Sequence, residues 1–166
     1  MKSSWIGTVL CIVLALAFPA VLSAQTDLHV IGSGSVETNC LLTLTENCTV
    51  TATGNMTGTG VNPGTFALRI DTGSPHTLNG NAGGQGFCLP ATGSGQVVET
   101  AGDTLTFNAV GSICEEGAPG SNYDYQATFR ITGGTGRFAT STGTGSLNGG
   151  FTRSGSSLLD IRGAIQ

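Results

Sequence analysis

Apolar and polar residues alternate along much of the chain beyond its first two dozen positions. Between residues 123 and 132, aromatic and aliphatic side chains occupy every second position, and polar or charged side chains lie between them. Successive side chains of a β-strand point to opposite faces, so this spacing predicts a half-buried strand. Residues 66–71, 104–108 and 159–166 repeat the pattern. The chain is therefore predicted to be all-β.

Glycine-rich turns separate these segments. Examples are Gly-Ser-Gly at 32–34, Asn-Gly at 79–80 and Gly-Gly-Thr-Gly at 133–136. Glycine supplies the positive φ angles that tight hairpins need. We predict about eight strands in an antiparallel barrel or, alternatively, a β-sandwich, and favour the barrel because closure removes exposed edges. Residues 79–95 and 117–122 show no clear alternation and are predicted to be loops, the first one held by its cysteine.

The first 24 residues are typical of a secretory signal peptide. Lys2 precedes an apolar run at 5–18, and small residues at 19–24 suit cleavage after Ser23 or Ala24. Cleavage would leave residues 25–166, enough for a single domain with a real core. No later apolar run approaches the ~20 residues of a membrane-spanning helix. We expect a secreted or periplasmic protein without a membrane span.

The charge balance excludes some classes of partner. The whole chain has a net charge of −4, and Lys2, its only lysine, belongs to the predicted signal peptide. A nucleic-acid-binding protein needs a basic face to displace counterions from phosphates, and anionic lipid attracts basic segments in the same way. We therefore expect no nucleic acid among the partners and no electrostatic attachment to membranes.

Four cysteines follow the predicted signal peptide: Cys40, Cys48, Cys88 and Cys114. In an exported domain they predict two disulfides, for which three pairings exist. We favour Cys40–Cys48 and Cys88–Cys114, because each pair brackets a segment that can fold back on itself. The spacing lacks the close Cys-X-X-Cys or His-X-X-X-His pairs of a zinc site, so we expect neither a metal nor another cofactor.

One segment resembles a known family. Residues 129–138 read FRITGGTGRF, and residues 139–145 continue as ATSTGTG. The segment is similar to the strand–GGTG[KR]F–strand part of dirigent proteins and allene oxide cyclases, and still closer to that of small secreted bacterial proteins of unassigned role. The resemblance implies an eight-stranded antiparallel barrel with room for an apolar cavity, a hairpin turn at 133–136, and Phe138 packed into the barrel. It ends before the acidic and arginine residues of dirigent proteins, so it carries over no catalytic position.

Asp71-Thr72-Gly73 is the only string that looks catalytic. After Leu68 and Ile70 it resembles the active-site turn of aspartic peptidases, in which two aspartates share a proton. A chain with one copy would have to form a homodimer, and Arg69 stands where that family has an apolar residue. The simpler interpretation is a strand that ends in a turn. Asp71 is thus a weak catalytic candidate, in a remote alternative as a dimeric peptidase.

Three acidic residues surround the glycine-rich loop after Cys114: Glu115, Glu116 and Asp124. Carboxylates on one loop can bind Ca²⁺, which takes six or more oxygen ligands. Their spacing matches no known calcium loop. We therefore interpret them as a solvated acidic loop.

Two further sets of polar residues have simple explanations. Thr49, Thr51 and Thr53 form a ladder that could bind ice or a carbohydrate, although threonine suits any exposed strand face. His29 and His76 have no serine or cysteine nucleophile motif beside them. Neither set defines a catalytic site.

Together these features predict an exported, disulfide-stabilised barrel that acts as a non-enzymatic binding or structural protein. The alternative is a carrier of a small apolar ligand, or a cyclase-like or dirigent-like barrel, with the ligand against Tyr123, Tyr125 and Phe129. Charged residues at outward positions argue against a charged interior: Asp124, Arg130, Asp160 and Arg162. The apolar residues expected to face inward are Phe66, Leu68, Ile70, Leu105, Phe107, Tyr123, Tyr125, Phe129, Phe138, Leu159 and Ile161.

Overall fold

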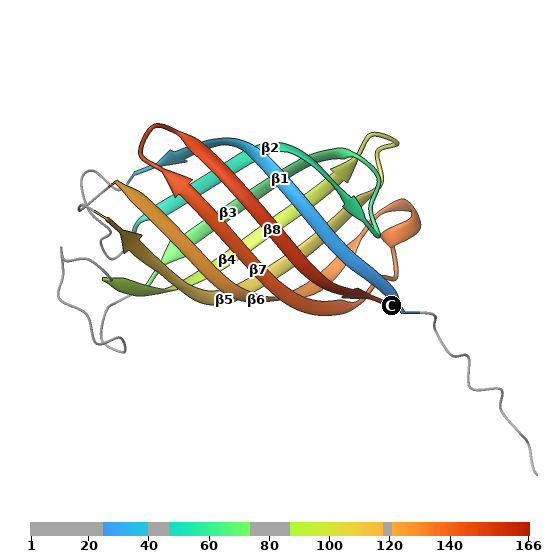
Figure 1. Ribbon diagram of the computed structural model, residues 1–166. Helices are drawn as coiled ribbons and strands as arrows, with labels where there is room; N and C mark the ends of the chain where they lie inside the picture. Colours follow the sequence, from blue (N-terminus) through green and yellow to red (C-terminus); the bar gives the residue numbers. More distant parts are fainter. Residues whose placement is uncertain (1–24, 40–46, 74–86, 118–120) are drawn as a thin grey trace, which may run out of the picture.

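The computed structural model describes residues 25–39, 47–73, 87–117 and 121–166. They form eight antiparallel strands, each paired with the next and the last with the first, so that the sheet closes into a barrel (Figure 1). This confirms the predicted eight-stranded antiparallel barrel. The elements are β1 (Thr26–Thr38), β2 (Thr49–Thr59), β3 (Gly64–Thr72), β4 (Cys88–Glu99), β5 (Thr104–Glu116), β6 (Asn122–Gly134), the 3-10 helix η1 (Gly136–Phe138), β7 (Gly143–Thr152) and β8 (Ser156–Ile165).

The two ends of the barrel carry different connections. The β2–β3, β4–β5 and β6–β7 connections lie at one end together with η1, and we call this the η1 end (Figure 1). The opposite end holds the β5–β6 and β7–β8 connections. The predicted signal peptide at 1–24 lies outside the described residues, and within those residues no helix is long and apolar enough to cross a membrane.

The alternation seen in the sequence separates the core from the surface. All eleven residues expected to face inward are buried. The four charged residues expected to face outward lie at exposed or half-buried positions on the outer wall: Asp124, Arg130, Asp160 and Arg162. A sheet closed on itself encloses one interior, so the buried apolar side chains form a single core.

The core is built from large rings placed against glycine. Gly95 lies directly opposite Phe107 in the β4–β5 ladder, and a Cβ atom at Gly95 would overlap the Phe107 ring. At Gly32, a Cβ atom would lie 2.7 Å from Cε1 of Phe66. Phe107 also packs edge-on against Phe129, with ring centroids 5.7 Å apart. Large side chains therefore occupy the space that glycine leaves free.

The prediction of a loop at residues 79–95 is wrong for residues 88–95, because β4 already begins at Cys88. The inward positions of this strand include Gly93 and Gly95, where side chains of other strands fill the space. Glycine at inward positions hides the apolar half of the alternation, and Pro90 adds a residue that is rare in strands. Residues 79–86 lie outside the described part of the chain.

Candidate functional site

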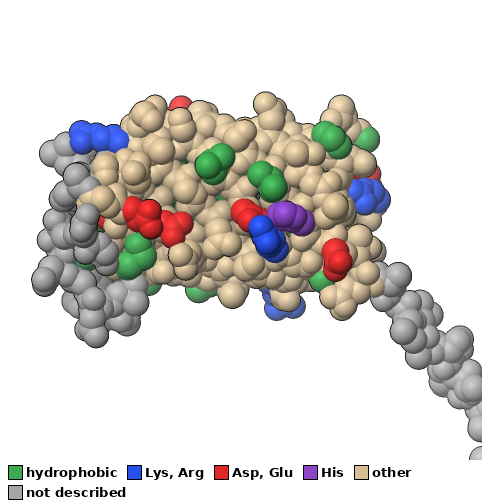
Figure 2. Space-filling model, in the orientation of Figure 1, with side chains coloured by type: hydrophobic (Ala, Val, Ile, Leu, Met, Phe, Trp, Pro, Cys, Tyr) green, Lys and Arg blue, Asp and Glu red, His purple; other side chains and the backbone are tan. Residues whose placement is uncertain are grey.

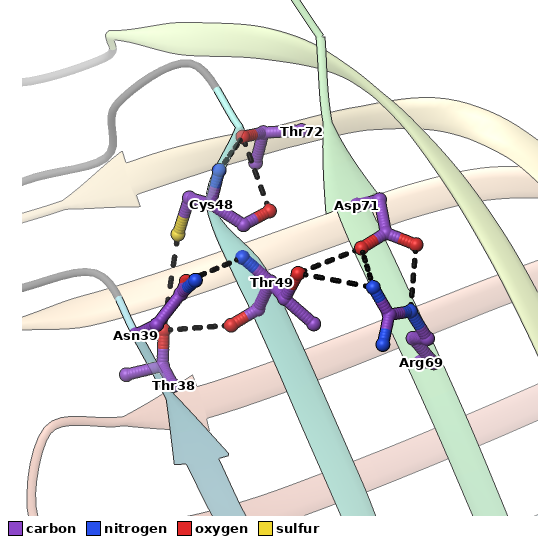
Figure 3. Close-up of polar contacts among 7 residues, drawn as sticks. All are labelled: Thr38, Asn39, Cys48, Thr49, Arg69, Asp71 and Thr72. Atoms are coloured by element: carbon purple, nitrogen blue, oxygen red, sulfur yellow. Dashed lines mark hydrogen bonds and ion pairs between the residues drawn. The ribbon is translucent and has the colours of Figure 1, made fainter.

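The Asp71-Thr72-Gly73 segment lies at the end of β3, with Asp71 on the outer wall (Figure 3). Arg69 Nε and Nη2 donate to the two carboxylate oxygens of Asp71 at 2.8 and 2.7 Å, and Thr49 Oγ1 donates to Oδ1 at 2.7 Å. The hydrogen bonds from the guanidinium lower the pKa of the Asp71 carboxyl. A peptidase pair must instead share a proton. These contacts therefore favour a structural role for Asp71.

Polar contacts beside Asp71 hold the ends of β1, β2 and β3 together. Asn39 Oδ1 accepts a hydrogen bond from the Thr49 backbone N–H at 2.6 Å. Thr72 Oγ1 accepts one from the Cys48 backbone N–H at 2.8 Å (Figure 3). Backbone groups at the ends of these strands are therefore satisfied by side chains of their neighbours.

The Cys88–Cys114 disulfide is present, as predicted. It joins directly opposite residues of β4 and β5, and a sequence separation of 26 residues closes a substantial loop. Cys48 is also disulfide-bonded, while its predicted partner Cys40 lies outside the described residues. The described cysteines therefore all serve as crosslinks.

Tyr123, Tyr125 and Phe129 all lie on β6 and point into the barrel, where each is at most 6% exposed. Burial raises the pKa of Tyr125 to about 12. Its hydroxyl has no hydrogen-bond partner among the described residues. A Cβ atom at Gly93 would lie 2.9 Å from this hydroxyl, so the glycine provides its space. The three residues predicted to bind a ligand are thus part of the packed core, and ligand binding by them stays a prediction.

Replacing Tyr125 with phenylalanine is expected to raise the free energy of unfolding by about 1 kcal/mol, because it removes a buried hydroxyl that has lost its hydrogen bonds to water. Urea denaturation measures the change. Gly93→Ala provides a matched test, since its added methyl group approaches the same hydroxyl. Gly93→Ala should cost less stability in the Tyr125→Phe background than in the wild type. A loss of stability in Tyr125→Phe itself would contradict the assignment.

The predicted acidic loop is wrong for Glu115. Glu115 is an inward residue of β5 and is 1% exposed, while Glu116 faces the outside. Burial, and secondarily the charge of Glu115, raise the pKa of Tyr123. Within the part of the chain that the structure describes, no group of His, Cys, Asp and Glu residues is arranged to hold a metal ion. The calcium alternative therefore gains no support from these three carboxylates.

An ion pair at the η1 end involves the arginine of the GGTGRF segment. Arg137 Nε and Nη2 donate to the Glu99 carboxylate, and Arg137 Nη2 also donates to the Gly60 carbonyl oxygen at 3.0 Å. Glu99 accepts two further hydrogen bonds from Asn62, at 2.6 Å from the backbone N–H and 3.1 Å from Nδ2. The Arg137 contact, opposed by burial and helped by Asn62, lowers the pKa of Glu99 to about 2. One arginine thereby joins β4, the β2–β3 connection and η1.

Sequence reasoning missed this ion pair. The expectation of an uncharged interior is wrong at Glu99 and Glu115, which both continue the inward alternation of their strands. The sequence contained one signal for the buried position of Glu99: it follows Val97 by two positions, and residues two apart in a strand point to the same face. The β6–β7 connection also contains η1 in place of the simple hairpin turn implied at 133–136, and Phe138 packs inward as implied, at 2% exposed.

Charged and hydrophobic side chains are sparse on the face of the outer wall that Figure 2 draws. On the face drawn in Figure 2, most of the visible surface is neither charged nor hydrophobic, and the charged side chains form small separate groups. One such group joins His29 Nε2 to Asp160 Oδ1 at 3.2 Å and Arg162 Nη2 to Asp160 Oδ2 at 2.8 Å. His76 lies outside the described residues. His29 therefore takes part in a surface ion cluster without a nucleophile.

Two open hollows lie on the outer wall across β2 to β7. The first has a volume of about 350 Å³ and lies over β2 to β6, and Thr51 of the predicted threonine ladder is one of its lining residues. The second has a volume of about 520 Å³ and extends over β5, β6 and β7. Asn108 lines both of them, so the two hollows adjoin at this residue.

The fold and these features define a closed antiparallel β-barrel with a packed interior. No family model matches the chain, and no curated protein or solved structure matches it significantly.

Proposed function

We propose that this chain is an exported, disulfide-stabilised, non-enzymatic binding protein that contacts its partner through the outside of a rigid barrel. The observation that carries the proposal is the packing of the interior. Inward rings such as Phe107 lie against glycine on the facing strand, and the inward apolar side chains are buried together. Such an interior offers stability and little room for a guest, whereas the hollows described above open to solvent.

The arrangement of ionisable groups supports a non-enzymatic role. A catalytic acid or base must reach a substrate and exchange a proton near the working pH. Glu99 is held ionised in a structural ion pair, and Asp71 is held by Arg69 on the outer wall. Among the residues that the structure describes, neither group lies beside a histidine, cysteine or serine arranged as a nucleophile. The dimeric peptidase therefore stays a remote alternative.

The second candidate is a carrier of a small apolar ligand or a cyclase-like or dirigent-like barrel, and the Tyr125 hydroxyl favours it. This hydroxyl is fully buried and has no partner among the described residues. A ligand that accepted its hydrogen bond would satisfy it. The barrel would then have to open around Gly93 and Gly95, where Tyr125 and Phe107 already occupy the space beside the glycines.

Native mass spectrometry of the oxidised protein after export distinguishes the two candidates. A surface-acting protein is expected to appear at its bare mass, because no guest molecule is enclosed. A copurified apolar molecule that persists in the wild type and is lost in Tyr125→Phe would overturn the proposal in favour of the carrier.

A further inference from the structure

A row of outward residues crosses the outer wall at right angles to the strands. Arg69 lies opposite Ser94, Ser94 opposite Asn108, Asn108 opposite Arg130, and Arg130 opposite Thr144. The two hollows on the outer wall follow this row from β3 to β7. We call the two adjoining hollows, with these five residues along their length, the outer groove. Neighbouring strands lie about 4.8 Å apart, so Arg69 and Arg130 stand roughly 14 Å from each other.

The charge of the outer groove differs from that of the chain as a whole. The chain has a net charge of −4, yet within the described part of the chain no Asp or Glu lines either hollow. Arg69 is paired with Asp71. Arg130 is exposed and forms no hydrogen bond or ion pair with the residues that the structure describes. An exposed guanidinium with free donors therefore stands in a neutral depression, a setting that suits a carboxylate or another planar anion.

The remaining lining suits a sugar better than a peptide. Ser94, Asn108, Thr128 and Thr144 provide hydroxyl and amide groups, which can both donate and accept hydrogen bonds. Val110, 66% exposed, adds an apolar surface beside them, against which the C–H face of a sugar ring can pack. One common way for a peptide to bind is to extend a sheet, and the barrel formed by the described strands leaves no free edge for this.

From this geometry we propose that the outer groove binds an extended acidic polysaccharide, with the carboxylate of a uronic acid residue accepting hydrogen bonds from Arg130. Asn108 and Thr144 then hydrogen-bond to hydroxyls of the same and the adjoining sugar. The length of the row, roughly three strand spacings between the arginines, spans more than one sugar unit. This inference rests on the proposed function, since it names the partner of the outer wall.

The test uses oligogalacturonate as the probe and a neutral oligosaccharide of equal length as its reference, with binding measured by isothermal titration calorimetry on the oxidised protein. We expect binding of the acidic oligomer that weakens as salt rises, and Arg130→Gln is expected to weaken it about tenfold, as the loss of one charge-assisted hydrogen-bonded contact does. Arg153→Gln is the matched control, because it removes an exposed arginine outside the groove. Its affinity should match the wild type.

Equal losses in Arg130→Gln and Arg153→Gln would overturn the site, because overall charge and not the groove would then govern binding. Binding of the neutral oligosaccharide as tightly as the acidic one would overturn the role of the carboxylate and leave a surface-acting binding protein in place. Absence of binding to both sugars, with a bare mass in native mass spectrometry, would overturn this inference alone. A guest molecule inside the barrel would overturn the proposed function itself.

Discussion

Replacing Arg137 with alanine is expected to lower the free energy of unfolding by about 3 kcal/mol, because it leaves the Glu99 carboxylate inside the barrel without its guanidinium. The Glu99 side chain is fully buried, and only the two groups of Asn62 would remain to hydrogen-bond to it. Breaking a buried ion pair costs roughly 3–5 kcal/mol, and we place this pair at the lower end because Arg137 is itself 44% exposed. Urea denaturation at neutral pH measures the change.

The effect of Arg137→Ala should also depend on pH. Arg137 lowers the pKa of Glu99 to about 2 from a usual value of 4.5, so the folded state binds this proton more weakly than the unfolded chain. The stabilisation is therefore fully present above pH 4.5 and is lost as the pH falls towards 2. In Arg137→Ala the carboxyl can become neutral at a higher pH, so the gap between variant and wild type should narrow between pH 4.5 and 2.

Two controls separate the ion pair from a general effect of charge. Arg153→Ala removes an exposed arginine and should change stability by no more than about 0.5 kcal/mol. Glu99→Gln combined with Arg137→Ala should recover part of the loss, because no unpaired charge is then buried. A constant gap across the acidic range, or an equal loss in Arg153→Ala, would show that the buried carboxylate is not the cause.

The strands that could be predicted from the sequence are those in which apolar side chains occupy successive inward positions and so produce a visible alternation. β3, β5, β6 and β8 show this alternation directly. β4 does not, because Gly93 and Gly95 yield their space to Tyr125 and Phe107 from other strands. A periodic pattern in the sequence reflects only the side chain that each residue itself carries. A strand with glycine at its inward positions, where side chains of other strands fill the core, therefore resembles a loop in the sequence.

The candidate sites were harder to predict because they depend on pairing between distant strands. Arg137 and Glu99 are 38 residues apart and meet only when the barrel closes. Asn108 and Arg130 lie opposite each other because of the register of β5 and β6, which shifts at Thr106/Phe107. No local pattern encodes such a shift. Asp71, in contrast, lies in a local motif that the sequence shows, but its ion pair with Arg69 gives it a structural role.

Gly54→Ala is expected to lower the free energy of unfolding by about 3 kcal/mol, because backbone atoms of β1 already occupy the position that the added methyl group would take. Gly34 and Gly54 lie directly opposite each other in the β1–β2 ladder. A Cβ atom at Gly54 would overlap the Ser33 carbonyl oxygen and lie 2.7 Å from Cα of Gly34. Backbone cannot rotate aside as a side chain can, so the two strands would have to separate locally. Thermal or urea unfolding measures the loss.

Gly150→Ala is the matched control, since it makes the same chemical change within β7 where a Cβ atom would meet nothing within 4 Å. It should leave stability unchanged or slightly raised, because alanine restricts the unfolded chain more than glycine does. Combining Gly34→Ala with Gly54→Ala should cost less than the sum of the two, because the first substitution already separates the strands that the second one needs apart. If Gly54→Ala and Gly150→Ala unfolded alike, the close approach of β1 and β2 would not be what requires glycine there. A loss in Gly54→Ala alone would show that β1 and β2 meet at this point through direct contact of two backbones.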